Sequence, residues 1–375
     1  MSNPENATRP MSALKAWSFV ALAVVLAVMS ITMWRFLAAA GYFTAIKKEV
    51  TAQCSAIPSP PGPEDIEIDR ARGLAFVSAY DRRLLNSGAT AARGGIYVID
   101  LTAPVEHWQL RPVTAMEPVA FNPHGISLYH GADGMERLFA VNHPAEGQHS
   151  VDIFDVAADG TLTLVRSVTD PLLVSPNDIV AVGPESFYAT NDHGTSNATK
   201  AMIDDLLLSR NANVVYYDGS TMSQAADLLS FANGINKSAD GKTIYVAESL
   251  GLSLHIYARD EETGKLTPKD FTQLGTGLDN IDVLEDGALL IAAHPKITSF
   301  ISHAGDAAEL SPSQVLRVEL AGEGGGGKAG TIYLNLGQEI SGSTVAAGWR
   351  DLMLIGNAFE PKILVCEQSK EIRAY

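Results

Sequence analysis

The sequence predicts an all-β fold, a six-bladed β-propeller, preceded by one N-terminal hydrophobic helix. The main observation is a unit that occurs six times, in which a polar or glycine pair and usually an isoleucine precede a polar turn and a second hydrophobic strand. The units begin at Glu64-Asp65-Ile66, His124-Gly125-Ile126, Asn177-Asp178-Ile179, Asn233-Gly234-Ile235, Asp279-Asn280-Ile281 and Gly342-Ser343-Thr344. They start roughly 45 to 65 residues apart, near the period of propeller blades with variable loops. Chance similarity among short β-hairpins is the alternative, but the unit is long and its order is kept.

The third unit, Ser175 to His193, shows the pattern most clearly. Two runs of β-forming residues are separated by Gly183-Pro184, which indicates a strand, a tight turn and a second strand. Asn177 and Asp178 stand before the first strand, and Asp192 and His193 follow the second. Polar side chains where loops meet a sheet are typical of functional sites. We therefore expect the site at the ends of these strands.

The amino-terminal region divides into a tail, residues 1–15, and a hydrophobic segment, residues 16–40. The run from Ala16 to Trp34 carries no charge and is long enough to span a bilayer. A retained signal anchor is the favoured interpretation. A signal peptide cleaved near Ala38-Ala39-Ala40 and a buried core helix are the alternatives. The charges on the two sides, Arg9 and Lys15 against Arg35, Lys47 and Lys48, give no clear membrane orientation.

The two cysteines, Cys54 and Cys366, lie at opposite ends of the region from residue 50 to 375 that we assign to the propeller. A disulfide between them would tie the first strand to the last and would fit an exported protein. Closing so long a loop contributes about 4–5 kcal/mol in the chain-entropy model. Two unrelated buried thiols are the alternative. We place the propeller outside the cytoplasm, membrane-anchored or secreted.

Composition narrows the class of partner. The chain of 375 residues is 46% hydrophobic, which is ample for a packed core, and carries a formal net charge of −16. So acidic a chain repels phosphate backbones, so nucleic acid is not an expected partner, whereas a cation suits it. The sequence gives no oligomeric state.

In a propeller the innermost strands begin at one end of a central tunnel, so residues far apart in sequence meet there. The expected ring offers only carboxylate and amide oxygens, from Glu64, Asn177, Asn233, Asp279 and Asn280. Oxygen ligands and no sulfur favour a hard cation, and Ca²⁺ accepts such a set at about 2.3–2.6 Å. Because adjacent strand residues face opposite sides, Asp65 and Asp178 point away from this ion. With a backbone carbonyl such as that of Ile126 they can hold a second, more buried ion.

His124 and His143 stand at corresponding loop ends of the second unit. A functional pair and two separate structural histidines remain the two interpretations. Asp192, His193 and His294 are further candidates of second rank. The segment from Thr195 to Ala212 has the only clear helical pattern after residue 50, and is either a lid, a membrane-facing patch or surface packing. The run from Gly322 to Ala329 nearly matches a phosphate-binding loop, but Ala329 replaces the needed hydroxyl, so we interpret it as a flexible connection in the blades.

Several strings resemble the paraoxonase family of serum arylesterases and lactonases. They are GPEDIEI, FNPHGIS, VNHP, NDIVAVGPESFYATNDH, FANGIN, LDNI, AHP and GSTVA, in this order between residues 54 and 368. The resemblance implies a six-bladed propeller with two calcium ions in its tunnel and a disulfide between its first and last strands. It implies that Glu64, Asn177, Asn233, Asp279 and Asn280 hold the catalytic ion, and that Asp65, Asp178 and the Ile126 carbonyl hold the structural one.

The resemblance also implies that His124 and His143 form a catalytic dyad, and that lactones and aryl esters are the substrates. The chain departs from the vertebrate pattern in the loop from Ala79 to Arg83, in the helical segment, and at Ala293, where a cysteine is usual. These departures bear on substrate preference. A gluconolactonase-like sugar lactonase and a non-catalytic strictosidine-synthase-like propeller are the alternatives, and the full oxygen ring with both histidines argues against a mere scaffold.

Overall fold

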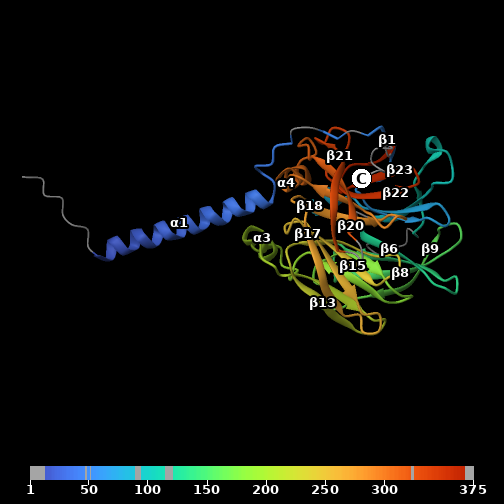
Figure 1. Ribbon diagram of the computed structural model, residues 1–375, viewed down its shortest axis with the longest axis horizontal. Helices are drawn as coiled ribbons and strands as arrows, with labels where there is room; N and C mark the ends of the chain where they lie inside the picture. The colour runs from blue at the N-terminus through green and yellow to red at the C-terminus, as the bar shows by residue number, and fades with distance from the viewer. Residues whose placement is uncertain are drawn as a thin grey trace, which may run out of the picture.

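The computed structural model describes residues 13–46, 49–50, 52–88, 94–114, 121–321 and 325–367. Six four-stranded antiparallel sheets surround a central axis, which confirms the six-bladed propeller (Figure 1). The innermost strand of each sheet packs against the innermost strands of both neighbouring sheets, and this closes the ring. These strands are β2 (Pro63–Asp69), β6 (Pro123–His130), β10 (Pro176–Ala181), β14 (Ala232–Lys237), β18 (Gly277–Val283) and β22 (Ser343–Trp349).

The remaining strands follow in sequence from the axis outward. The second strands are β3 (Leu74–Ala79), β7 (Glu136–Asn142), β11 (Phe187–Asn191), β15 (Thr243–Glu248), β19 (Leu289–His294) and β23 (Leu352–Asn357). The third strands are β4 (Gly95–Asp100), β8 (Ser150–Val156), β12 (Ala212–Tyr217), β16 (Ser253–Arg259), β20 (Ser313–Ala321) and β24 (Lys362–Glu367). The outer strands are β5 (Arg111–Pro112), β9 (Leu162–Val168), β13 (Met222–Leu229), β17 (Leu266–Gln273), β21 (Gly325–Asn335) and β1 (Cys54–Pro58).

The sixth sheet joins the two ends of the propeller. Its order is β1-β24-β23-β22, so the first strand of the chain completes the last blade. Cys54 lies opposite Cys366 in this pairing, and the two form a disulfide with an S–S distance of 2.05 Å. The predicted bridge is therefore confirmed, and the alternative of two unrelated thiols is wrong. The bridge closes a sequence separation of 312 residues and so restricts the unfolded chain strongly.

The apolar core lies between the blades rather than along the axis. One buried cluster combines Ile66, Val77 and Ile99 of the first blade with Val345 and Leu354 of the last. Similar clusters fill the other interfaces between blades. Because this packing fixes each innermost strand from both sides, side chains at the strand starts are held on a rigid frame.

Every innermost strand has an irregular register at its polar pair. The shifts fall between Pro63 and Asp65, Pro123 and Ile126, Pro176 and Ile179, Ala232 and Ile235, Leu278 and Ile281, and Ser343 and Val345. A bulge adds a residue to one strand and redirects its side chains. The polar pairs therefore do not follow simple strand alternation, and the site is built from six bulges at one end of the tunnel.

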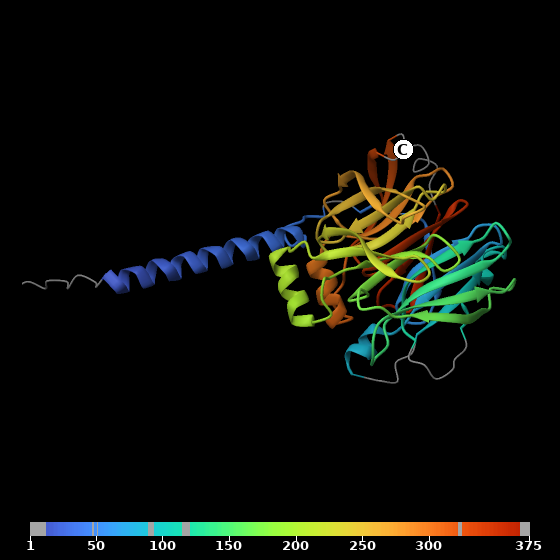
Figure 2. The same ribbon diagram turned by 90° about the horizontal axis from the view of Figure 1, so that it is seen from below.

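Helices cover this same end of the tunnel. α1 (Ala13–Ala39) extends away from the propeller. α3 (Ala198–Leu207) and α4 (Ile297–Gly305) lie beside the end of α1 that is next to the propeller (Figures 1 and 2). α2 (Arg82–Asn86) and the 3₁₀ turn η1 (Val105–His107) are shorter. The sequence pattern indicated only the segment that contains α3, and the structure adds α2 and α4. Helices of five and nine residues are too short to be stable alone, so their formation depends on packing.

Two sequence expectations need further comment. Of the expected tail, residues 1–12 lie outside the described residues and residues 13–15 belong to α1; residues 322–324 of the glycine-rich run also lie outside the described residues. Residues 325–329 form the start of β21 and pair with β20, so this part of the run is a strand and not a flexible connection.

α1 contains a span of 23 residues, Trp17–Ala39, that is long and apolar enough to cross a membrane, with a mean hydropathy of 2.1. None of its hydrophobic window is buried in the protein, so the alternative of a buried core helix is wrong. The residues directly after α1 contact the propeller. The backbone N–H of Thr298 donates to the Ala40 carbonyl. Gly41, with φ +69°, lies so close to the Pro295 backbone that a Cβ would not fit.

Candidate active site

A cavity of 370 Å³ opens at the end of the tunnel where the innermost strands begin. Seven of the predicted site residues line it. Five of these lie on the innermost strands of five different blades, namely Glu64, His124, Asn177, Asn233 and Asp279, and the other two are Asp192 and His294. Asn280 is buried beside them and donates from Nδ2 to Glu64 Oε1 at 3.0 Å. The bulges therefore bring all members of the predicted oxygen ring to one place.

Four oxygens in this ring have no hydrogen-bond partner within the described part of the chain. They are Glu64 Oε2 and the Oδ1 atoms of Asn177, Asn233 and Asn280, and all four residues are buried. An unpaired buried acceptor costs about 1–3 kcal/mol, so four at one point call for an additional partner. A cation that takes oxygen ligands would supply it.

The asparagine amides are oriented so that their oxygens stay free. Asn177 Nδ2 donates to Asp192, Asn233 Nδ2 donates to the Ser249 hydroxyl, and Asn280 Nδ2 donates to Glu64. Carboxylates only accept hydrogen bonds, so the nitrogen of Asn177 and of Asn280 must face them and the oxygen must turn away. Ser249 is fixed in turn, because its hydroxyl donates to the Leu278 carbonyl.

Two basic groups flank the carboxylates of the ring. His294 Nε2 lies 2.7 Å from Asp279 Oδ2, and Arg82 Nη2 lies 3.8 Å from Glu64 Oε2. Burial alone would raise the pKa of Glu64, yet the nearby His124 and Arg82 hold it below its usual value. Burial raises the pKa of Asp279, against the opposing effect of His294. The donor set is thus oxygen-only and partly ionised, which fits a hard cation such as Ca²⁺.

Asp65 and Asp178 lie deeper and link neighbouring blades. Asp65 accepts from the backbone N–H of Ile66 and of Ile126, at 2.8 and 2.7 Å. Asp178 accepts from Ile179 and Ile235, at 2.7 and 2.8 Å. Each carboxylate therefore crosses to the innermost strand of the next blade. The close approach depends on small residues, since a Cβ on Gly125 would lie 2.2 Å from Asp178 Oδ1.

These two carboxylates are electrostatically unfavourable in the protein alone. Burial, and then repulsion from Asp178 and Glu64, raise the pKa of Asp65 well above its usual value. Burial likewise raises the pKa of Asp178, although two backbone N–H groups oppose the shift. A carboxylate accepts more than two hydrogen bonds, so lone pairs remain on both for a cation.

His124 and His143 are in contact behind the ring. His124 Nδ1 lies 3.0 Å from His143 Nε2, and His124 Nε2 faces Glu64 Oε1 at 3.4 Å. Burial holds the pKa of His143 well below its usual value, and the neighbouring His124, His149 and Arg82 act in the same direction. The two rings are therefore in direct contact, with one ring at the cavity and the other behind it.

The second-rank candidates behave differently from one another. His193 does not line the cavity but lies between Asp192 and Asp205, with ring nitrogens 2.7 and 3.0 Å from their carboxylates. Although burial favours the neutral ring, these hydrogen bonds raise its pKa to about 10. Asp205 belongs to α3, so His193 fastens this helix over the cavity. Asp192 and His294 orient ring members, as described above.

Sequence reasoning missed several contributors. Arg82 was noted only as a departure in its loop, yet it also stacks over Tyr80 at 4.0 Å and lines the cavity. Ser249 and Asp205 carried no recognisable signal, because each acts through a partner distant in sequence. His149 follows His143 by six residues and meets it ring to ring, with Nδ1 atoms 3.0 Å apart. Two histidines within seven residues, His143 and His149, were the one feature of the sequence that could have indicated this contact.

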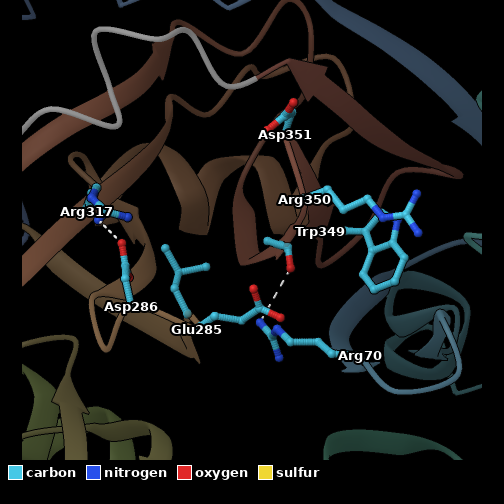
Figure 3. A pocket seen from close by; sticks show the side chains of 9 residues that line it. Arg70, Glu285, Asp286, Arg317, Trp349, Arg350 and Asp351 are labelled. Atoms are coloured by element: carbon cyan, nitrogen blue, oxygen red, sulfur yellow. Dashed lines mark hydrogen bonds and ion pairs between the residues drawn. The ribbon is translucent and has the colours of Figure 1, made fainter.

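A second cavity of 410 Å³ lies at the opposite end of the tunnel (Figure 3). Basic and acidic side chains are mixed in it, and they pair with each other. Arg317 contacts Asp286, and Arg70 contacts Asp282 at 2.8 Å. Arg350 lies over the Trp349 ring at 4.8 Å. Because these charges already have partners, the first cavity is the better candidate for the site.

Comparisons with known proteins identify the family of the chain. A family model described as Arylesterase matches residues 56–368. Serum paraoxonase/arylesterase 2 of Rattus norvegicus is 35% identical over 311 residues, which cover 82% of this chain and 86% of the relative. Serum paraoxonase/arylesterase 1 of Homo sapiens is 34% identical over 313 residues, and serum paraoxonase/lactonase 3 of Rattus norvegicus is 33% identical over 312, with the same coverage in both cases.

Solved structures support the fold alone. A luciferin-regenerating enzyme matches with a TM-score of 0.51 at 10% identity, covering 84% of this chain and 95% of that structure. A protein assigned as a gluconolactonase matches with a TM-score of 0.50 at 14% identity, covering 86% and 94%. The family match spans nearly all of the propeller and the predicted resemblance is confirmed with it. The expectation of an enzyme of the arylesterase and lactonase class is confirmed at the level of the family, and we conclude that the chain belongs to the arylesterase family.

Proposed function

We propose that this protein is a calcium-dependent hydrolase of lactones and aryl esters, in which the His124–His143 pair activates water. The observation that carries the proposal is the ring of partnerless buried oxygens beside that pair. A structural scaffold would have no use for several unsatisfied acceptors at the end of its tunnel.

The proposed cation ligands are those of the ring. Glu64, Asn177, Asn233, Asp279 and Asn280 would hold the catalytic ion, and Asp65, Asp178 and the Ile126 carbonyl a structural one. When bound, calcium would polarise the substrate carbonyl and stabilise the negative charge that develops on its oxygen. The support for this from the chain itself is the two carboxylates of the ring, Glu64 and Asp279, together with the three buried asparagine oxygens that have no hydrogen-bond partner within the described residues.

The chain's own groups would manage the protons. His124 Nε2 faces the cavity and would accept a proton from water. His143 contacts the other ring nitrogen of His124 and would fix its tautomer and orientation. Its depressed pKa keeps His143 neutral near pH 7, so it can accept a proton from His124 as well as donate one.

The walls of the cavity suit an apolar acyl or aryl group. The rings of Phe300 and Phe359 are in contact, with centroids 5.4 Å apart and planes tilted by 45°, and both line the cavity with Ile297 and with Phe36 of α1. The relatives' names include paraoxonase, arylesterase and lactonase. Aromatic walls on one side and polar groups on the other fit an ester or lactone with a hydrophobic part better than a sugar lactone.

The test is a substrate panel with and without calcium. Aryl esters and acyl lactones should be hydrolysed, gluconolactone poorly, and EDTA should abolish turnover. His124→Gln should lower kcat by about 100-fold or more while calcium stays bound, because general base catalysis contributes about 10²–10⁴-fold. His130→Gln, an exposed change at the far end of the same strand, is the control. Preference for gluconolactone would favour a sugar lactonase, and no hydrolysis of any substrate would favour a binding scaffold.

We further propose that α1 anchors the protein in a membrane with the propeller outside the cytoplasm. Apolar side chains of α3 and α4, including Met202, Ile203, Leu207 and Ile301, are exposed on the side where α1 leaves the propeller. The disulfide fits an oxidising compartment. Leu22→Lys combined with Leu26→Lys should move the full chain from the carbonate-resistant membrane fraction to the soluble fraction. Continued sedimentation of this variant with membranes would contradict the proposal.

A further inference from the structure

A third histidine continues the row that begins at the cavity. His149 Nδ1 lies 3.0 Å from His143 Nδ1, with the ring centroids 4.6 Å apart. His143 Nε2 in turn contacts His124 Nδ1 at 3.0 Å. Each contact uses a different nitrogen of His143, so the three rings form one continuous hydrogen-bonded row from Glu64 outward.

The row runs from the cavity to the loop before β8. His124 lines the cavity, His143 lies behind it, and His149, which is partly exposed like the other two residues, is at the last position before β8. The backbone of His143 is held on both sides, since its N–H donates to the Asn122 carbonyl and its carbonyl accepts from Asn122 Nδ2. The central ring is therefore fixed, and the outer ring reaches solvent.

Ester and lactone hydrolysis near neutral pH releases a proton, because the product acid ionises. Water must also lose a proton as it attacks, and the leaving oxygen must gain one. A buried base that faces only the cavity would have to return each proton through the space that substrate fills. A row of rings that ends in solvent removes this restriction.

We infer that His149 is the outer member of a three-histidine proton relay, which connects His124 to solvent through His143. This inference rests on the proposed hydrolase function. His149 does not touch the cavity, so it is a relay and positioning residue that acts through His143.

The steps balance in both directions. As an N–H bond forms at His124 Nε2 with a proton from water, the proton at His124 Nδ1 passes to His143 Nε2. The proton at His143 Nδ1 passes to His149 Nδ1, and His149 releases its Nε2 proton to buffer. All three rings stay neutral and have exchanged tautomers. When the leaving oxygen takes the proton from His124 Nε2, the same transfers run inward from solvent and restore the first tautomers.

Burial favours the neutral forms of the two outer members of the row, His143 and His149. Burial and the positive charge that His124 would carry lower the pKa of His149, while Asp192 opposes this. His143 is surrounded by His124, His149 and Arg82, and burial lowers its pKa most. Neutral rings can accept and donate at the same time, as a relay requires.

The test compares His149→Gln and His149→Ala with wild type and with His130→Gln in dilute buffer. Glutamine can hydrogen-bond to His143 but cannot pass a proton. We expect kcat to fall about tenfold or more in both His149 variants, with KM within about twofold, because one proton-transfer step loses its catalyst. Added imidazole should restore kcat of His149→Ala in a saturable manner. His130→Gln should match wild type.

Unchanged kcat in dilute buffer would overturn the inference, as would a loss that imidazole does not restore, since the latter indicates a merely structural role. A measurement without turnover separates this inference from the proposed function. Nuclear magnetic resonance of the wild type should show a low-field ring proton shared by His143 and His149, absent from His149→Ala. If the wild-type protein hydrolyses no substrate, the proposed function fails, and the shared ring proton then decides whether the hydrogen-bonded row of histidines exists. Absence of this proton from the wild-type spectrum would overturn the inference.

Discussion

The two ends of the central tunnel use similar residue types in different ways. Where the innermost strands begin, one buried oxygen each of Glu64, Asn177 and Asn233 has no hydrogen-bond partner within the described residues. Where the same strands end, Asp282 accepts from Arg70 and from the Gly348 backbone, each at 2.8 Å. At the first end, several buried acceptor oxygens lack hydrogen-bond donors, whereas at the second end Asp282 has its donors. We conclude that a charged end of the tunnel is a candidate site where its polar groups lack partners within the protein.

The largest expected effect is on calcium affinity, and it should distinguish two asparagines of strand β14. Asn233→Leu keeps the side-chain shape but removes an unpaired oxygen. We expect calcium affinity, measured by titration calorimetry, to fall by more than about 100-fold, since even groups that only support a metal ligand are worth about 10–100-fold. Asn236 lies three residues further along, and both ends of its amide are hydrogen-bonded. Asn236→Leu should reduce stability without weakening calcium binding. Equal losses of affinity in the two variants would break the comparison.

A smaller effect contrasts two glycines of the innermost strands. At Gly125 a Cβ would meet Asp178 Oδ1 at 2.2 Å and the Asp178 Cα at 2.5 Å. At Gly348 the nearest atom is the end of the Leu284 side chain, at 2.5 Å, which can rotate away. Overpacking costs about 1–3 kcal/mol. The loss in the free energy of unfolding, measured by denaturant unfolding, should be at or above the upper end of this range for Gly125→Ala and near its lower end for Gly348→Ala. The reverse order would show that the site end is the looser one.

A pH-dependent effect concerns the attachment of α3 at the site end. The pKa of His193 is about 10 in the folded protein, against about 6.5 in an unfolded chain. Because the folded value is the higher, its contribution to stability is fully present below about pH 6.5 and is lost as the pH rises through about 10. His193→Gln should therefore destabilise the protein at pH 6 and have little effect above pH 10. A difference in the free energy of unfolding that does not change with pH would contradict this.

The smallest effect is expected at the other end, from the ion pair of Arg317 and Asp286. The Asp286 side chain is 57% exposed, so solvent screens the pair. Exposed ion pairs contribute about 0.2–1 kcal/mol. A double-mutant cycle with Arg317→Gln and Asp286→Asn should give a coupling in this range and leave turnover unchanged. A loss of activity in either variant would give this end a role in function.

Much of the fold followed from local patterns. The six polar pairs with their following strands predicted the number of blades, and the turn expected at Gly183-Pro184 lies between β10 and β11. The short helices α2 and α4 were not predicted, because helices of five or nine residues are not stable alone and form only through packing against the rest of the protein. The roles of Ser249 and Asp205 depend on partners far away in the chain, which no local pattern reveals.

The sequence by itself determined the residue types of the site, because a ring of Glu, Asp and Asn offers only oxygen, and it determined the repeat that brings them to one end of a tunnel. Only the tertiary structure decided which oxygens stay free. That depends on the bulges at the polar pairs and on neighbours such as Asp192 and Ser249, which hold the amide nitrogens. It also decided that His149 meets His143, since a loop's path is set by what it packs against rather than by its own residues.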